Sequence, residues 1–114
     1  MKLLVCGGRD YQDGETVLLS ILYLHRRKSI TLLMHGGARG ADALAGAAAQ
    51  KLGIPTRAYP ADWHKHGAAA GVIRNQIMLT AGKPDMVLAF PGGRGTADMV
   101  RRARRAKVEV VKIG

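Results

Sequence analysis

The sequence predicts an α/β fold in which a doubly wound, parallel five-stranded sheet carries about four helices. Short apolar runs alternate with helical repeats along the chain, and this alternation is typical of a parallel sheet covered on both faces. Three of the runs are almost entirely apolar, as strands buried on both faces should be. The 114 residues suffice for one hydrophobic core, so we expect a single domain over residues 1–114.

The elements follow one another with short connections. The first strand covers residues 3–6, and the first helix covers residues 15–27, with Asp13 as its N-cap and Leu19 among its inward residues. In the third helix we expect Ile77 to face inward. The other expected elements are, in order, a strand at 30–34, a helix at 42–52, a strand at 55–59, a helix at 71–81, a strand at 86–90, a helix at 96–106 and a strand at 108–113.

Composition narrows the function classes. A formal net charge of +10 predicts attraction to anions such as phosphate ligands or nucleic acid. Aromatic residues make up only 4% of the chain, which is too few for an aromatic platform that stacks successive bases. Cys6 is the single cysteine, which favours a reducing, cytoplasmic location. No apolar run approaches the roughly 20 residues that span a bilayer, so we expect no membrane partner.

The glycines gather in three clusters, and each cluster directly follows a predicted strand. Parallel strands end at one edge of the sheet, so with a strand order of 3-2-1-4-5 the three loops should meet in one cleft. Glycine lets backbone amides approach a phosphate closely, and the next helix adds the positive end of its dipole. A single cluster would be no more than a tight turn. The clusters are Gly7 and Gly8; Gly36, Gly37 and Gly40; and Gly92, Gly93 and Gly95.

Charged residues accompany these glycine loops. Arg9, Arg39 and Arg94 lie inside the three loops and can add positive charge to a phosphate site. Asp42 and Asp98 occupy equivalent places in the two similar segments HGGARGAD and PGGRGTAD. Each carboxylate either caps its helix or pairs with the helix dipole. The alternative is a role in ribose binding or in catalysis, and the sequence leaves both readings open.

The order of motifs resembles a known family. CGGRD, HGGARGADALA, ADW, AGVIRNQIM and PDMVLAFPGGRGTADMV follow one another over nearly the whole chain, as in YspA-type (YpsA-related) domains of the SLOG superfamily. That superfamily includes the LOG phosphoribohydrolases and the DNA-processing protein A family. The resemblance implies a Rossmann-like fold that binds a nucleotide-derived, phosphate-containing ligand, as a sensor or a weak hydrolase. We expect no cofactor and no metal.

The resemblance also implies roles for individual residues. PGGRGT, which ends at Thr96, matches the phosphate motif of the phosphoribohydrolases, and Arg74 matches their arginine-bearing helix. Arg74 and Asn75 together resemble the RN pair of the DNA-processing family. The hydrolase motif requires a glutamate where this chain has Met99, so N-glycosidic hydrolysis remains an alternative, with Arg74 and Asp98 as its candidate catalytic residues.

Other polar and aromatic residues have two readings each. Trp63 either stacks on a nucleobase or covers the core as a lid. His64 and His66 lack the cysteines or carboxylates that would complete a metal site. His35, at a strand end, either contacts ligand or packs locally. Cys6 is interpreted as a small buried residue rather than a nucleophile, since no histidine is placed to activate it.

The last helix carries a basic run, with Arg101, Arg102, Arg104 and Arg105 outside and Met99 inside. Such a run is most often a solvated helix face, and the alternative is a nucleic-acid footprint, which gives a second functional reading as a nucleic-acid-binding module. The small residues between 41 and 49 would allow close packing of two helices. We therefore expect a homodimer.

Overall fold

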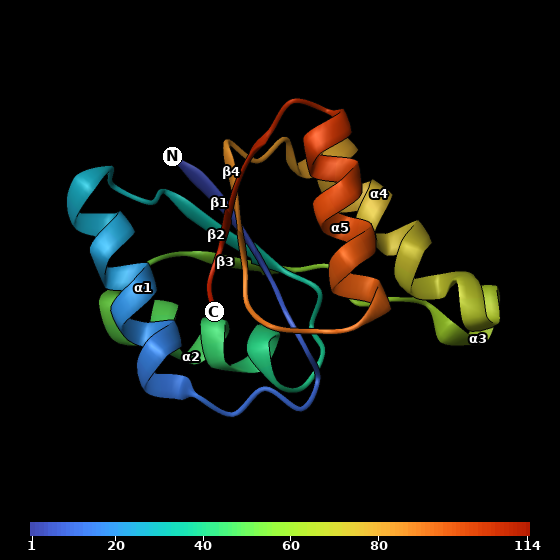
Figure 1. Ribbon diagram of the computed structural model, residues 1–114, viewed down its shortest axis with the longest axis horizontal. Helices are drawn as coiled ribbons and strands as arrows, with labels where there is room; N and C mark the ends of the chain where they lie inside the picture. The colour runs from blue at the N-terminus through green and yellow to red at the C-terminus, as the bar shows by residue number, and fades with distance from the viewer.

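The computed structural model describes residues 1–114. Its five strands form one parallel sheet in the order β3-β2-β1-β4-β5 (Figure 1), which confirms the predicted α/β class and meets the condition under which the three glycine loops lie together. The elements are β1 (Lys2–Cys6), α1 (Gly14–Arg27), β2 (Leu32–His35), α2 (Ala41–Leu52), β3 (Thr56–Ala58), α3 (Trp63–His66), the 3₁₀ turn η1 (Gly67–Ala69), α4 (Ala70–Gly82), β4 (Met86–Ala89), α5 (Arg94–Arg105) and β5 (Glu109–Lys112).

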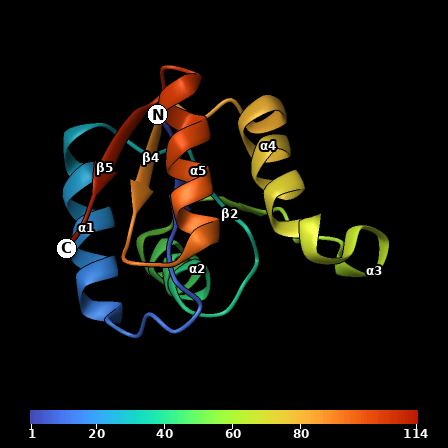
Figure 2. The same cartoon turned by 45° about the vertical axis from the view of Figure 1, so that its right-hand side comes forward.

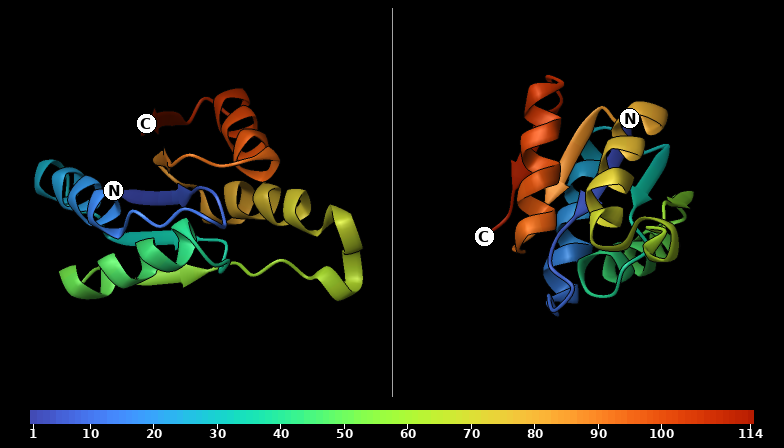
Figure 3. Two further views of the ribbon diagram at one scale, coloured as in Figure 1. Left: turned by 60° about the horizontal axis from the view of Figure 1, so that its bottom comes forward. Right: turned by 90° about the vertical axis from the view of Figure 1, so that its right-hand side faces the viewer.

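Two helices cover each face of the sheet. Alternate residues of β1 point to opposite faces, so Leu3 belongs to the core under α1 and α2, whereas Leu4 belongs to the core under α4 and α5. Figure 2 and the left view of Figure 3 show these two helix layers with the sheet between them. No helix combines the length and the apolarity that crossing a membrane requires.

The inward faces of two helices differ from the sequence prediction. Leu19 is 53% exposed, because α1 buries Val17 and Ile21 instead. Ile77 is 49% exposed, because the stripe that α4 turns toward α5 contains the buried Asn75. In α4 the buried stripe is not wholly apolar, so the spacing of the apolar residues does not locate it.

Two further differences lie near the ends of the strands. Between β3 and α4, where the sequence predicts no helix or strand, the chain forms the short helix α3, whose first turn is capped by the Asp62 carboxylate through the amide of Lys65 at 3.0 Å. The last helix begins at Arg94, two residues before the predicted start, so the end of the third glycine cluster is already helical. The predicted Asp13 cap of α1 is confirmed by its bond to the Thr16 amide at 3.0 Å.

Candidate functional site

A cleft of about 540 Å³ opens at the carboxyl ends of β1, β2 and β4. These three strands are neighbours in the sheet, so the loops that follow them lie side by side. Each of the three glycine loops contributes residues to the cleft wall. They are Gly7, Gly8 and Arg9 from the first loop, Gly36, Ala38 and Asp42 from the second, and Gly93, Arg94, Gly95 and Thr96 from the third.

The first loop holds the other two through its backbone. The amide of Gly8 donates to the carbonyl oxygen of Pro91 at 2.8 Å, and the carbonyl of Gly8 accepts from the amide of Ala41 at 3.1 Å. Gly40 has φ +77°, and a Cβ there would overlap the carbonyl oxygen of Gly8 and the main chain of Arg9. Only glycine fits this crossing, which explains why the loops come so close.

The N-terminus of α5 faces the cleft without a side-chain cap. Gly93 is the N-cap residue and offers no side chain, while Arg94, Gly95 and Thr96 form the first turn and line the cleft. The first amides of a helix have no intrahelical acceptor and carry the positive end of the helix dipole. Arg94 is exposed and has no carboxylate within salt-bridge distance, so its charge is available to a ligand.

Arg74 ties the second loop to the end of β3. One guanidinium nitrogen, Nη1, donates to the carbonyl of Gly36 at 2.6 Å and to the carbonyl of Tyr59 at 3.3 Å, and Nε donates to Asn75 Oδ1 at 3.2 Å. The side chain is half-buried and lines the cleft. Arg74 therefore shapes the loop through Nε and Nη1 and leaves Nη2 for a ligand anion.

Asp42 closes the second loop rather than capping α2. Its Oδ2 accepts from the amides of Gly36 at 3.1 Å and Ala38 at 3.2 Å, while the N-cap position of α2 is held by Gly40. Burial raises the pKa of Asp42 above its ordinary value, against the lowering effect of those hydrogen bonds. Burial likewise lowers the pKa of the adjacent His35, which accepts from the Gly37 amide through Nδ1.

Asp98 lies at the opposite side of the cleft and has a different environment. Its Oδ2 accepts from Arg102 Nε at 2.8 Å and from Asn75 Nδ2 at 3.1 Å, and its Oδ1 lies 3.5 Å from a guanidinium nitrogen of Arg101. Burial alone would raise the pKa of Asp98, but these hydrogen bonds and the two arginine charges outweigh it and lower the pKa. Asp98 is therefore an ionised carboxylate held by Asn75, Arg101 and Arg102.

Four residues of the predicted set do not line the cleft. Arg39 points away and pairs with Asp10 at 3.3 Å, with both side chains largely exposed. Gly37 is exposed, and Gly40 lies behind the first loop at the crossing described above. Gly92 packs against Thr96 and the amide of Gly8, where a Cβ would overlap them.

The cleft has a second, apolar wall, for which the loop pattern gives no signal. It comes from α3, η1 and α4, and its members include Trp63, Ala68, Val72 and Met78. Trp63 is 47% exposed and belongs to neither core, so it is not a lid over the core. The guanidinium carbon of Arg9 lies 4.9 Å from the centre of its ring.

Two other side chains that the sequence analysis considered, Cys6 and Arg101, also line the cleft. Cys6 lines the cleft floor and is buried, and burial together with the Asp42 charge raises its pKa to about 12. A thiol with that pKa remains protonated at neutral pH and is a poor nucleophile. Arg101 also lines the cleft, although the sequence placed it only on the outer face of the helix.

Comparisons with known proteins find a matching protein family, a similar sequence and a similar structure. Residues 1–66 match the family described as YspA, cpYpsA-related SLOG family. The chain is similar to the gene 61 protein of Mycobacterium phage D29, with 38% identity over 121 residues that cover 99% of this chain and 96% of that protein. It is also similar in structure to DNA processing protein A (DprA) from Streptococcus pneumoniae, with a TM-score of 0.80 and 20% identity. That match covers 99% of this chain and 50% of the DprA chain, and at this identity it concerns the fold alone.

Proposed function

The chain belongs to the YspA, cpYpsA-related SLOG family, and on that premise we propose that its cleft binds a nucleotide-derived, phosphate-containing ligand. One observation carries the proposal. Four arginines and two carboxylates line the same cleft as the uncapped N-terminus of α5, which leaves a surplus of positive charge where backbone amides are unpaired. Such an arrangement favours an anion with several acceptor oxygens. The volume of about 540 Å³ suits a ligand of nucleotide size.

The proposal is tested by calorimetric titration of the native protein with AMP and with ADP-ribose. Replacing Arg94→Ala removes a cation that has no partner in the protein, so the fold should be unaffected. We expect affinity to fall about 10- to 150-fold, the loss of one charge-assisted hydrogen bond. Arg39→Ala is the matched control, because Arg39 also belongs to a glycine loop but pairs with Asp10 outside the cleft. Equal effects of the two substitutions, or no binding at millimolar ligand, would refute the proposal.

We propose a sensor rather than an efficient hydrolase. Asp98 is ionised and held by Asn75, Arg101 and Arg102, so it has no proton to give to a leaving base. Asp42 has a raised pKa and a second oxygen, Oδ1, that accepts no hydrogen bond from the protein, so any weak hydrolysis would use Asp42. The check is to incubate the protein with nucleoside monophosphates and follow free base by chromatography. Turnover that survives Asp42→Asn and disappears with Asp98→Asn would contradict this assignment.

Nucleic-acid binding is the second candidate, and the surface of α5 favours it. Arg104 and Arg105 are exposed and have no carboxylate partner, and the chain as a whole carries a net charge of +10. Arg102 is less available, since it binds Asp98 and Gln76. The name of the structurally similar DprA refers to DNA processing. Binding of a single-stranded oligonucleotide that weakens steeply with salt, and that Arg104→Ala with Arg105→Ala reduces, would support this candidate.

The homodimer stays a prediction. The small residues of α2 on which it was based pack inside the protein, with Ala41, Ala45 and Ala49 fully buried against α1 and the sheet. Any interface between two copies therefore has to use another surface. Light scattering at tens of micromolar protein would decide whether a dimer forms.

A further inference from the structure

We propose that Trp63 forms a base-stacking subsite of the cleft, occupied by the guanidinium of Arg9 when no ligand is bound, and that the subsite selects purine nucleotides over phosphates without a base. This inference rests on the proposed function, because it assumes that a phosphate ligand enters the cleft. It goes beyond it by assigning the apolar wall a ligand chemistry of its own.

The first step is that Trp63 does not serve the fold. It is the only tryptophan, it is 47% exposed, and it belongs to neither hydrophobic core. It begins α3, which packs against η1 and α4 and stands away from the two helix layers (Figures 1 and 3). An indole that is not covered by the fold exposes a large apolar face to water, which is unfavourable. A planar group stacked on that face removes it from water and so stabilises the complex.

The second step is the wall around the ring. Cη2 of Trp63 lies 3.6 Å from where a Cβ of Gly71 would stand, so the first turn of α4 supports the edge of the indole. The neighbouring cleft residues Ala68 and Val72 have no side-chain hydrogen-bonding group. A base placed here is held by stacking and is not read along its edges. The subsite should therefore accept adenine and guanine similarly and bind the smaller pyrimidines more weakly.

The third step is the position of Arg9. Its guanidinium carbon lies 4.9 Å from the ring centre, which is the place that a stacked planar group takes, and Arg9 has no carboxylate partner to hold it there. A base cannot enter between the ring and a group whose central carbon lies 4.9 Å from the ring centre, so a base that stacks on this face has to displace the guanidinium. Arg9 belongs to the first glycine loop, and its freed charge then lies next to the phosphate side of the cleft.

A small ligand explains this subsite better than a nucleic-acid strand does. Proteins that bind single strands stack successive bases on successive aromatic rings. Trp63 is the only aromatic residue that lines this cleft, and Tyr11 and Phe90 pack against each other in the core on the opposite face of the sheet. A single aromatic ring can stack one base, which suits a mononucleotide better than a strand of several bases.

The single tryptophan provides a direct assay on the native chain. AMP, GMP, CMP and ribose 5-phosphate are titrated while the emission of Trp63 is followed, and affinities are measured by calorimetry. We expect AMP and GMP to quench the emission and to bind about 5- to 150-fold more tightly than ribose 5-phosphate, which has the phosphate and no base. CMP should fall between them.

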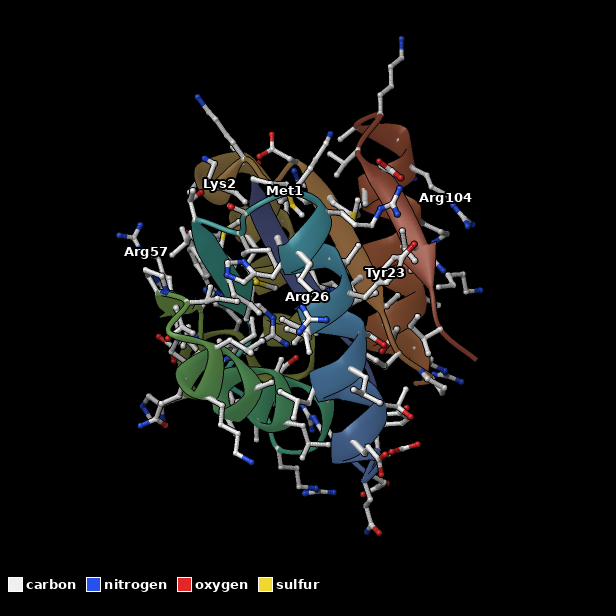
Figure 4. All side chains as sticks on the ribbon, turned by 90° about the vertical axis from the view of Figure 1, so that its left-hand side faces the viewer. Met1, Lys2, Tyr23, Arg26, Arg57 and Arg104 are labelled. Atoms are coloured by element: carbon white, nitrogen blue, oxygen red, sulfur yellow. The ribbon has the colours of Figure 1, made fainter.

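Substitutions separate stacking from phosphate binding. Trp63→Ala should lower the affinity for AMP about 5- to 150-fold and should not weaken the binding of ribose 5-phosphate, whereas Trp63→Phe should keep most of the preference for AMP. Tyr23→Ala is the matched control, because Tyr23 also has an arginine, Arg27, over its ring, but lies on α1 (Figure 4), which Figure 1 shows at the opposite end of the molecule from α3. It should change neither affinity. Thermal unfolding of each variant should match that of the native protein, since both rings are about half exposed or more.

The outcomes distinguish the two proposals. AMP binding without quenching, or an AMP affinity that Trp63→Ala leaves unchanged, overturns the base subsite and leaves the proposed function standing. A deoxythymidine oligonucleotide that quenches Trp63 at micromolar concentration while AMP does not overturns it in favour of a single-strand site. Absence of binding by all four small ligands at millimolar concentration overturns both proposals.

Discussion

Asp98→Asn tests whether Asp98 is a structural carboxylate, as its contacts indicate, or the catalytic acid that the sequence allowed. The substitution keeps the size of the side chain and removes its charge. In the native protein Oδ2 accepts from Arg102 and Asn75, and Oδ1 faces Arg101. In the variant an amide NH₂ replaces one carboxylate oxygen, so at least one of these donors loses its acceptor.

The size of the effect follows from the exposure of the partners. The side chains of Asp98 and Arg102 are 11% and 27% exposed, so their hydrogen bond is largely shielded from water, and losing such a charged bond costs about 1.5–3 kcal/mol. The ion pair with Arg101, whose side chain is 64% exposed, adds less than about 1 kcal/mol. We expect a loss of about 1.5–3 kcal/mol in the free energy of unfolding at pH 7, which lowers Tm by roughly 5–15 °C.

The pH dependence supplies a sharper check. Because the folded protein lowers the pKa of Asp98 below 3.8, its contribution is present above that value and is lost as the pH falls through the lowered pKa. Urea unfolding of the native and variant proteins between pH 7 and pH 3 should show a constant difference above pH 5 that shrinks below pH 4. Equal stability at pH 7, or a difference that persists unchanged at the lowest pH, would refute this account of Asp98.

Three other predictions concern the same cleft. For Asp42→Asn we expect a pH dependence of stability that has the opposite sign, because burial raises the pKa of Asp42. The stability of the native protein relative to the variant should be greatest below pH 3.8 and should fall as the pH rises through the raised pKa. Urea unfolding at several pH values measures this difference. Met99→Glu introduces the glutamate of the hydrolase motif, but Met99 is fully buried, so a carboxylate there has no water around it. We expect the free energy of unfolding to fall by about 3 kcal/mol or more, as measured by thermal unfolding. A stable variant that releases free base would contradict this. Gly40→Ala should cost more than Gly53→Ala, by about 1–3 kcal/mol, because both glycines have positive φ but only Gly40 lacks space for a Cβ; equal Tm values would show that the loop crossing is not tight.

The sheet and its loops were within reach of the sequence because they depend on local signals. Each glycine cluster directly follows an apolar strand, and adjacency of β2, β1 and β4 then brings the three loops to one edge. The sequence could not tell which face of a loop turns inward. Arg39 and Arg9 look alike in the sequence, yet Arg39 pairs with Asp10 outside the cleft and Arg9 reaches Trp63.

The errors at α4 and α3 have different causes: a long-range contact at α4 and the lack of periodicity in the segment that follows α3. Asn75 is buried because Asp98, on another helix, accepts its hydrogen bond, and no local pattern predicts a polar residue on an inward stripe. Ile77 is consequently displaced to the surface. The apolar wall of the cleft exists because η1 carries the chain from α3 to α4, and the small residues of that segment show neither helical nor strand periodicity.

The two candidate functions depend on different arginines, so one protein can separate them. A nucleotide in the cleft would use the half-buried Arg74 and the exposed Arg94, which both line it, whereas a nucleic-acid strand would use Arg104 and Arg105, which do not line it. Each phosphate neutralised on an open surface releases counterions and steepens the salt dependence, while a contact inside a cleft is screened less. If Arg94→Ala lowers affinity without changing the salt dependence, and the double substitution of Arg104 and Arg105 does the reverse, each ligand has its own surface. The charge of +10 alone cannot make that distinction, because it does not say which cations are already paired.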